Sequence, residues 1–547
     1  MATFPAYGGA RPLKHPPARG EGSVWGPLRD RLFLALWIAA LASNVGTWMQ
    51  NVGAAWLMTT LSPSPLVVSL IQTATSMPIF LLALPAGALA DVIDRRRLLL
   101  FSQGWMLLAA AALGILTLEG MATPLAVLAL SFALGVGAAL NAPAWQAIVP
   151  ELVGRDELTA AIALNGINFN LARAIGPALG GVIVSLMGAG ATFLLNAVSF
   201  LGVMAVLYEW RHKHQPGVLP AERVVGAMRS GLRYVRYAPP LRAVLVCTAA
   251  FIVGGSAMWA LLPLLARNQL GMDASGYGGM LACFGVGGAV GGTLLVWAGE
   301  RVSRDRMFAA ASVVFAVMSA GLFYCRAFTL VYALMVAGGA AWVVAMSELN
   351  VAAQLSVPKW VQGRALSCYQ IVMWGGMAVT SVLWGELAER IGIPDALLCA
   401  AVTQLLGMAA LLRYSIAGAD ELELDPMPPI PMPKLAEPVP PEAGPVMVTV
   451  EYAIDPARAQ EFEETMLQLR IIRRRDGAHF WGLFFDAQRP ERYVEYFVVD
   501  SWIEHMRQHQ RGTLADQDIF EHARTFQLDD GTPAVRHQIA ADTIRRR

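Results

Sequence analysis

The residues of this chain that could do chemistry are charged or polar side chains that interrupt long apolar stretches. One run joins Asp91 to Arg95, Arg96 and Arg97 between two apolar segments. Three adjacent arginines cannot lie in the core of a bilayer, so this run must lie at a water interface. An acidic and several basic residues at that edge can pair and separate, which is the chemistry of a gate. The arginines would also serve as simple topology determinants, and this alternative stays open.

A second acidic and basic run repeats this arrangement later in the chain. Glu300 and Arg304 stand at the acidic and the first basic position, 209 residues further on (300 − 91). The segments 146–153 and 354–361 also match each other, at an offset of 208 (354 − 146). Two matches at nearly one offset predict a duplicated membrane domain, which is typical of transporters. We therefore assign Glu300 and Arg304 to the same gating role.

Arg173 is an unusual residue to find inside an apolar stretch, here the segment 158–186. It lies about 15 residues, or on the order of 22 Å along a helix, from the start of that segment. A guanidinium at that depth costs at least ~2.5–3.5 kcal/mol unless it is paired or faces water. Asn170 shares its helical face and can help to solvate it. Arg173 is either part of the substrate or proton pathway or a structural arginine held by helix-terminal carbonyls or by Glu151.

Glu348 is the one carboxylate inside the apolar segment 328–353. A carboxylate that faces a water-filled cavity in a membrane can exchange protons with it. The alternative is an interfacial charge near the cytoplasmic end of the segment. Both interpretations, a proton-pathway residue and an interfacial charge, are kept.

Asn44, Trp48 and Asn51 form one stripe of a predicted helix, at positions i, i+4 and i+7. Because the stripe combines amides with an aromatic ring, we favour a role in lining a substrate cavity. Interhelical hydrogen bonds, typically worth ~0.6 kcal/mol each, are the alternative. Three further tryptophans could form apolar walls for a ligand or simply pack: Trp145, Trp259 and Trp342.

Signals for cofactors and catalysis are weak. His505 and His509 lie four residues apart on a predicted helix, a spacing that suits a metal pair, but no partner ligands are evident. We interpret them as structural or solvent-facing and expect no metal site. The glycine run 285–292 lies inside an apolar span, which indicates close helix packing, and no nucleotide-binding G-x4-G-K-[S/T] loop occurs. We expect no cofactor, no catalytic residue and no enzyme activity.

The composition is that of a membrane protein. The chain has 547 residues, of which 56% are hydrophobic and 15% are charged, and its mean hydropathy is +0.50. A net charge of +1 gives no reason to expect nucleic acid as a partner. Twelve apolar stretches are long enough to cross a bilayer. They centre near 32–58, 65–90, 98–119, 123–149, 158–186, 191–209, 243–267, 275–298, 307–325, 328–353, 364–389 and 394–413.

The distribution of basic residues predicts the orientation of these spans. The loops on one side include 95–97, 211–242 and 301–306, which are rich in arginine. The loops on the opposite side contain only three basic residues, Arg267, Arg326 and Arg390. By the positive-inside rule, the arginine-rich loops and both termini are cytoplasmic. We expect a multi-pass protein of the inner membrane, with the lipid bilayer as a partner.

The segment after Arg413 changes character. Residues 416–445 are rich in proline and predict a semi-rigid linker. Beyond it, strands are expected near 446–452, 479–486, 492–499 and 534–539, with helices over 456–475 and about 502–525. The order β-α-β-β-α-β predicts a soluble ferredoxin-like α+β domain. The predicted domains are an N-terminal tail 1–30, six-helix bundles 31–209 and 243–415, a central loop 210–242, the linker 416–445 and the α+β domain 446–540.

The arginine-rich loop resembles the signature Gly-x-x-x-Asp-x-x-Gly-Arg-[Arg/Lys] of the major facilitator superfamily. Gly87, Asp91, Arg95 and Arg96 match it, whereas Asp94 replaces the second glycine. In that family the acidic and basic residues form a network that gates the cytoplasmic side. The resemblance therefore implies a major facilitator fold of twelve helices in two six-helix repeats.

The segment 158–186 also resembles the antiporter motif of this superfamily. The matching residues are Gly176, Pro177, Gly180 and Gly181, whereas the two upstream glycine positions hold Ala163 and Ala172. The resemblance implies that these residues take part in the conformational change.

The stretches 44–51 and 144–181 are similar to one efflux branch of the superfamily. This branch contains enterobactin-exporter-like and macrolide-efflux-like proteins, some of them described as transmembrane secretion effectors. The resemblance covers roughly residues 30–415. The tail, with Trp502 to His509 opening a helix, is similar to dimeric α/β barrels of the antibiotic-biosynthesis-monooxygenase type.

These features predict a secondary-active exporter of a hydrophobic or amphipathic small molecule, in exchange for protons. A siderophore, an antibiotic or another secondary metabolite would be the substrate, and residues 446–540 are expected to self-associate. Two alternatives remain: a membrane-anchored enzyme or sensor that acts through the C-terminal domain, and an importer.

Overall fold

The computed structural model describes most of the chain. The described residues are 25–154, 157–210, 231, 233–299, 301–358, 360–419, 423–428, 435, 437–528 and 533–541, without the side chains of 84, 88, 90–92, 150 and 151. Glu300 and the side chains of Asp91 and Glu151 thus lie outside the described residues. The roles assigned to Asp91 and Glu300 stay predictions.

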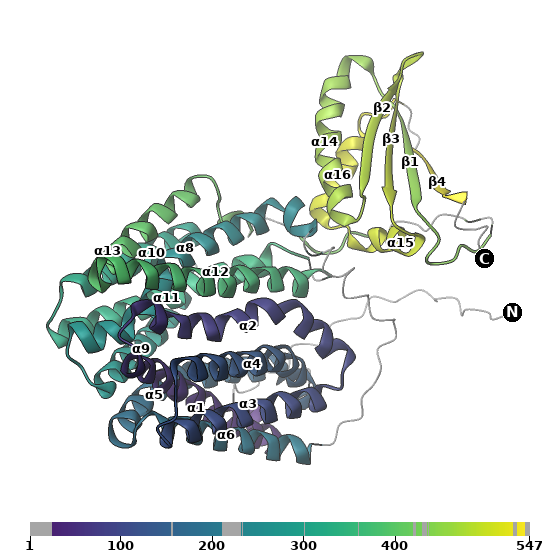
Figure 1. Cartoon of the computed structure of the whole chain (residues 1–547). Helices are drawn as coiled ribbons and strands as arrows, with labels where there is room; N and C mark the ends of the chain where they lie inside the picture. Colours follow the sequence, from purple (N-terminus) through teal and green to yellow (C-terminus); the bar gives the residue numbers. More distant parts are fainter. Residues whose placement is uncertain are drawn as a thin grey trace.

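Within the described residues, twelve helices are long and apolar enough to cross a membrane, as the sequence predicts. The first bundle contains α1 (Arg31–Leu61), α2 (Pro65–Val92), α3 (Arg95–Leu118), α4 (Pro124–Leu152), α5 (Leu158–Met187) and α6 (Ala189–Glu209). The second contains α8 (Pro239–Leu264), α9 (Ala274–Ala298), α10 (Arg304–Tyr324), α11 (Phe328–Leu355), α12 (Gln362–Ile391) and α13 (Ile393–Gly407). The two bundles lie one above the other in Figure 1.

Local sequence explains where these helices begin and turn. Asp94, the residue that replaces the signature glycine, caps α3, because its carboxylate accepts a hydrogen bond from Arg97 N at 2.9 Å. Ser64 caps α2 in the same way. Gly188 and Gly392 have positive φ angles of 81° and 94°, which let the chain reverse between α5 and α6 and between α12 and α13.

The C-terminal domain contains one antiparallel sheet of order β2-β3-β1-β4, covered by helices. Its elements are β1 (Val446–Ala453), α14 (Ala459–Asp476), β2 (Phe480–Asp486), β3 (Arg489–Val499), α15 (Trp502–Arg511), α16 (Leu514–Arg524) and β4 (Ala534–Ile539). The predicted succession of four strands along the chain is confirmed. The prediction of one helix over 502–525 was wrong, because Thr513 and Asp516 form a capping box that starts a new helix.

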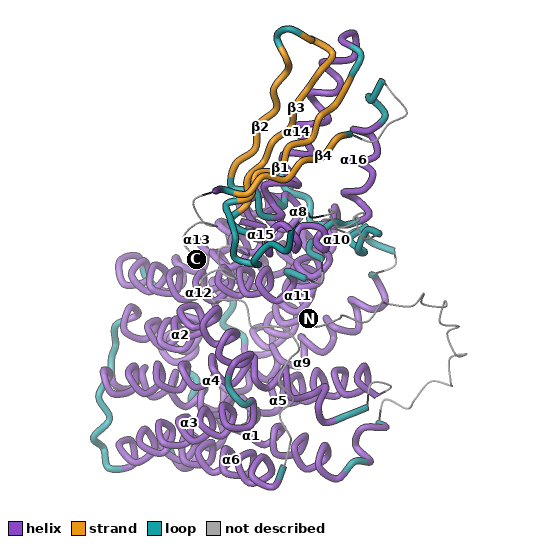
Figure 2. Tube along the Cα trace, turned by 90° about the vertical axis from the view of Figure 1, so that its right-hand side faces the viewer, coloured by secondary structure: helices purple, strands orange, loops and turns teal. Residues whose placement is uncertain are grey.

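The C-terminal domain stands at one end of the bundles, which we call the tail side, and the opposite end is the far side (Figures 1 and 2). Helices α1, α3 and α5 of the first bundle start on the tail side, and so does α12 of the second. The bundles meet along two helix pairs, α2 with α12 and α5 with α9. Both pairs lie side by side in Figures 1 and 2.

Candidate functional site

One face of α5 changes from exposed to buried near the middle of the helix. In the half nearer the tail side this face is exposed, at Ile162, Gly166, Phe169 and Asn170. In the far half the same face is buried, at Gly176, Pro177, Gly180 and Val184. Arg173 is half-buried at the change. The helices that cover this face must therefore diverge from α5 toward the tail side.

The glycines of α9, in the second bundle, show the same separation from α5 toward the tail side. A side chain at Gly278 would strike Pro177 O at 2.5 Å, and one at Gly285 would strike Arg173 O at 2.6 Å. Further toward the tail side, Gly288 faces the guanidinium of Arg173, and Gly292 has nothing within 4 Å. The two helices are thus in backbone contact on the far side and separate beyond Arg173.

Arg173 contacts the residue that the sequence predicted as its neighbour. Its Nη2 donates to Asn170 Oδ1 at 3.1 Å, and Asn170 Nδ2 donates to Gly166 O at 3.0 Å. The Nε atom is buried and has no hydrogen-bond partner among the described residues. A buried donor of this kind normally has a partner, so it is suited to accept a polar group of a ligand or water.

A group of aromatic rings lies across the same interface. Trp48 of α1 lies 6.4 Å from Phe169 of α5 and 6.4 Å from Trp259 of α8, measured between ring centroids. Trp259 in turn contacts Phe284 at 5.4 Å and Trp342 at 5.7 Å. The structure therefore groups Trp48 with two of the three predicted wall tryptophans, and it adds two phenylalanines that the sequence did not single out.

The remaining predicted tryptophan and the two predicted amides lie in other environments. Trp145 packs in a separate cluster of the first bundle. Asn44 Nδ2 donates to Asn168 Oδ1 at 2.9 Å, and Asn168 Nδ2 donates to Trp37 O at 2.8 Å. This is the interhelical bonding that stood as the alternative for the stripe. Asn51 is exposed, so the three stripe residues do not share one environment.

The glycines of the antiporter-like motif face two different neighbours. Added side chains at Gly176 and Gly180 would strike α1, at Trp48 Cβ and Met49 Cα. A side chain at Gly181 would lie 2.9 Å from Gly278 Cα of the other bundle. The motif thus brings α5 close to α1 within its bundle and to α9 across the interface, as small residues do in membrane helices.

Arg304 and Glu348, to which the sequence gave separate roles, form one ion pair. Arg304 Nη1 lies 2.7 Å from Glu348 Oε2. The Glu348 side chain is 4% exposed and that of Arg304 is 24% exposed. The pair links the tail-side end of α10 to α11 and borders a cavity of about 490 Å³. Glu348 is therefore a buried, paired carboxylate near the tail side.

The predicted gate arginines of the first repeat bind backbone carbonyls. Arg95 Nη1 donates to Ala147 O of α4 at 3.1 Å. Arg96 donates to the last carbonyls of α6, from Nε to Leu207 O at 2.7 Å and from Nη2 to Tyr208 O at 2.5 Å. A cation at this helix end also complements the helix dipole. Both arginines join the start of α3 to its neighbours.

Comparison with known proteins agrees with this architecture. A profile of the transmembrane secretion effector family matches residues 22–545. The chain belongs to this family. It is 25% identical to the staphyloferrin A transporter of Staphylococcus aureus (strain NCTC 8325 / PS 47), over 64% of this chain and 87% of that protein. It is also 25% identical to the multidrug efflux pump Tap of Mycolicibacterium fortuitum, over 69% of this chain and 94% of that protein.

Two further comparisons extend these findings. The enterobactin exporter EntS of Shigella boydii serotype 4 (strain Sb227) is 26% identical over 47% of this chain and 62% of its own length. A bacterial homologue of the lysosomal transporter Spinster has a TM-score of 0.57 at 14% identity, over 72% of this chain and 97% of that one. The membrane part is therefore a major facilitator fold, and the protein is a transporter homologous to siderophore and drug efflux pumps.

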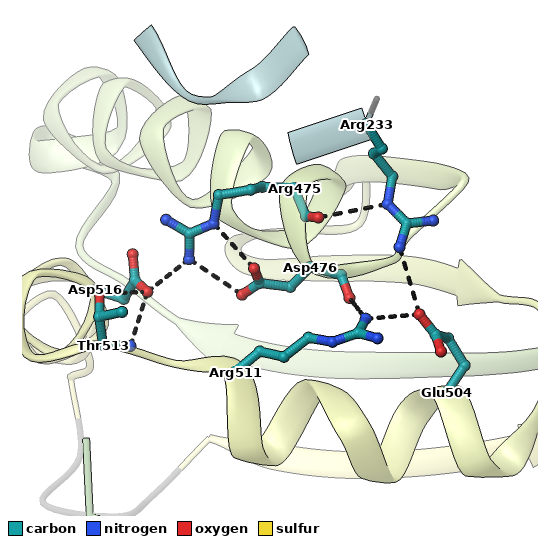
Figure 3. Close-up of polar contacts among 7 residues, drawn as sticks. All are labelled: Arg233, Arg475, Asp476, Glu504, Arg511, Thr513 and Asp516. Atoms are coloured by element: carbon teal, nitrogen blue, oxygen red, sulfur yellow. Dashed lines mark hydrogen bonds and ion pairs between the residues drawn. The ribbon is translucent and has the colours of Figure 1, made fainter. Parts of the chain in front are cut away.

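In this secretion-effector-family transporter, the C-terminal domain contacts the membrane part through the charged groups of Figure 3 and through one aromatic ring. Arg233, in the helical segment 233–237 before α8, lies 3.4 Å from Glu504 of α15 and donates to Arg475 O at 3.4 Å. The guanidinium of Arg511 lies 4.6 Å from the ring centroid of Trp360, between α11 and α12. The domain thus touches two tail-side connections of the second bundle.

The docking groups are held by a buried charge cluster. Arg475 binds Asp476 at 2.9 Å and Asp516 at 2.6 Å, and Arg511 binds Glu504 at 2.6 Å. Burial raises the pKa of Asp476 despite the adjacent Arg475. Burial acts to raise the pKa of Glu504, but Arg511, Arg233 and Arg507 together outweigh it, so that the pKa is lowered. Sequence reasoning missed this cluster, because its members come from three different helices, α14, α15 and α16.

Proposed function

We propose that this protein is a secondary-active exporter that moves a hydrophobic or amphipathic small molecule out of the cytoplasm by alternating access. The observation that carries the proposal is the change of exposure along α5 at Arg173, with α5 and α9 in contact on the far side and apart on the tail side. Relatives named as a staphyloferrin A transporter, an enterobactin exporter and a multidrug efflux pump support a siderophore, antibiotic or similar metabolite as substrate.

We place the tail side in the cytoplasm of the cell and the helices in the inner membrane. The arginine-rich connections lie on the tail side, with Arg95 and Arg96 at the start of α3 and Arg304 at the start of α10. The positive-inside rule assigns such connections, and with them both termini, to the cytoplasm. The separation beyond Arg173 then opens inward, where an exporter collects its substrate.

The substrate would lie between Arg173 and the aromatic group around Trp48 and Trp259. Arg173 offers a positive charge and a buried Nε donor that has no partner in the part of the chain that the structure describes, and the rings offer apolar surface. Asn170 positions the guanidinium, and exposed Asn51 adds a polar group on α1. This combination suits a molecule with both an apolar body and a polar or anionic group.

Proton exchange would act through the pair of Arg304 and Glu348. A buried carboxylate keeps its charge because a cation lies beside it, so protonation of Glu348 would release Arg304. Asp91 and Glu300 complete the proposed gate on the tail side. Asp91→Asn is expected to preserve expression and topology and to reduce transport severely, and an unchanged flux would remove Asp91 from the gate.

The direct test is accumulation of a panel of siderophores, macrolides and dyes in cells with and without the protein. Cells that express it are expected to accumulate less of the substrate, and an uncoupler is expected to abolish the difference. Depletion of ATP that preserves the proton gradient should leave the difference intact. Export that follows ATP would reject secondary transport, and increased accumulation would show an importer. The variant Glu348→Gln tests the coupling step alone, because its export rate is expected not to depend on pH.

The C-terminal domain is proposed to self-associate through the uncovered face of its sheet. Tyr496 of β3 stacks between Phe480 and Phe484 of β2 on that face, at 5.2 and 5.3 Å, and both phenylalanines are exposed. An exposed aromatic patch on a sheet is suited to pairing with a second copy. Phe484→Glu in the full-length protein is expected to lower the oligomeric state in light scattering, and an unchanged mass would refute this interface.

A further inference from the structure

Three histidines of the C-terminal domain meet between α15 and β4. His505 and His509 lie one turn apart on α15, and His537 projects from the face of β4 that the helices cover. His505 Nε2 lies 3.3 Å from His509 Nε2. Ligand nitrogens of all three residues lie within 4.8 Å of one another. The sequence revealed the first two but not the third, which lies beyond α16.

The separation of these nitrogens is close to that of a metal site. Zinc binds imidazole nitrogen at about 2.0–2.1 Å in tetrahedral geometry, which places two ligand nitrogens about 3.3–3.4 Å apart. His505 and His509 already stand at 3.3 Å. Even the longest separation in the group needs to shorten by only about 1.5 Å (4.8 − 3.3). Rotation of one imidazole on β4 supplies a shift of that size.

The hydrogen-bond partner of His505 selects the tautomer that suits a metal ligand. Gln508 Oε1 lies 3.4 Å from His505 Nδ1. Because an amide oxygen only accepts hydrogen bonds, Nδ1 carries the proton and Nε2 directs its lone pair toward His509. A ring with its single proton on Nδ1 presents Nε2 as a lone-pair donor, which is the form that binds metals.

The site also has room for a further ligand. A small cavity of about 40 Å³ borders His505, His509 and Gln508. This volume is enough for water. The acidic and basic groups in the same lining are already paired, Asp476 with Arg475 and Arg473 with Glu495. A hydrogen bond between His505 and His509 would explain their short distance, but it gives no reason for His537 to lie beside them.

We propose that His505, His509 and His537 bind one divalent transition-metal ion, with zinc the best match and a cavity water as the fourth ligand. Imidazole is the preferred protein ligand of such borderline ions. The ion would tie α15 to β4. Since α15 also carries Glu504 and Arg511, which contact the membrane part, metal binding would hold the docking surface of the domain in place.

The test uses the full-length protein, purified in detergent with a tag that contains no histidine and stripped with a chelator. Titration with Zn²⁺ is expected to show one bound ion per chain and a rise in the melting temperature. Titration with Co²⁺ is expected to give the visible absorption of a tetrahedral nitrogen site. An absence of binding, or binding without a rise in melting temperature, would overturn the proposal.

Two ligand variants and a matched control locate the site. His509→Gln and His537→Gln should each weaken binding by at least about 10–100-fold, since loss of an outer-shell partner alone has that effect. His522→Gln removes an exposed histidine of α16 and should bind like the wild type. Gln508→Ala keeps all three ligands and should weaken binding about tenfold. The metal-free melting temperature of each variant reports its folding, and equal affinity of His537→Gln and the wild type would refute the site.

Discussion

The two helix pairs that join the bundles occupy equivalent positions of the internal repeat, yet they are closed by different interactions. In one pair Pro177 of α5 contacts Gly278 of α9, and in the other pair Gly385 of α12 contacts Ser69 of α2. These residues are related by offsets of 208 (385 − 177) and 209 (278 − 69), the offsets found in the sequence. The duplicated chain therefore places the same two positions at both contacts.

The interactions that dominate the two contacts differ, although a side chain added at Gly385 would also lie 3.0 Å from Leu66 Cα, and Ser185 Oγ of α5 also donates to Asp273 Oδ2, the cap of α9, at 3.2 Å. Backbones touch directly between α5 and α9, where an added side chain at Gly278 would meet Pro177 O at 2.5 Å. Side chains bridge α2 and α12, where Ser64 Oγ donates to Glu389 at 2.6 Å and Thr73 Oγ1 donates to Ala378 O at 2.7 Å. A backbone contact accepts no larger residue, whereas hydrogen bonds can be weakened one at a time. We expect mutations to act in an all-or-none way at α5 and α9 and in a graded way at α2 and α12.

The largest effect is expected from Gly278→Leu. The new side chain has no space against Pro177 and Gly181, so the far side cannot close and transport should fall to background. Overpacking of this kind also costs about 1–3 kcal/mol of stability. Efflux assays and thermal unfolding in detergent measure the two effects. Gly202→Leu on α6, where nothing lies within 4 Å, is the control. Transport at the wild-type level in Gly278→Leu would show that this contact is dispensable.

A somewhat smaller effect is expected at Arg173, where the α5 and α9 contact ends. Arg173→Leu should abolish transport of the substrate without loss of folding, because it removes an insertion cost of ~2.5–3.5 kcal/mol. Arg173→Lys keeps the charge but loses the planar fork, so it should retain partial transport. The transport rate of each variant shows whether Arg173 is needed for export, and the melting temperature shows whether the variant is folded. Normal transport by Arg173→Leu would make this arginine purely structural.

At the α2 and α12 contact, Glu389 should tolerate change. Glu389→Ala removes the acceptor of Ser64 Oγ and Leu66 N, at 2.6 and 3.3 Å. The carboxylate is exposed, so the loss should be about 1 kcal/mol, or about fivefold in transport rate at most. Glu389→Gln keeps an acceptor oxygen and should lie near the wild type. A complete loss of transport in Glu389→Ala would mean that this contact, too, is all-or-none.

Much of this arrangement was predictable from local sequence. The twelve spans follow from apolar length, and the strands of the C-terminal domain follow from alternation, as at Val446 to Tyr452. The pair of Arg173 and Asn170 follows from helical spacing. Each of these predictions needs only residues that are close in sequence.

Contacts between helices were not predictable in the same way. The membrane helices are apolar on all sides, since lipid replaces water around them, so periodicity does not show which face packs inward. The pairing of Arg304 with Glu348 and the position of Phe284 beside Trp259 depend on that choice of face. His537 was missed for a related reason, because strand pairing sets which residue of β4 faces α15.

The smallest effect is expected from Thr73→Val, which removes a single hydrogen bond between α2 and α12. Thr73 Oγ1 donates to Ala378 O at 2.7 Å, and valine preserves the shape of the side chain. Interhelical hydrogen bonds in membranes average about 0.6 kcal/mol, so transport should change by less than about threefold. Combined with Glu389→Ala, the effects should add, because each removes a separate bond along the same contact. Initial efflux rates of the single and double variants measure this sum. If Thr73→Val alone stopped transport as Gly278→Leu should, the two contacts would not differ in kind, and the asymmetry between the repeats would have no functional meaning.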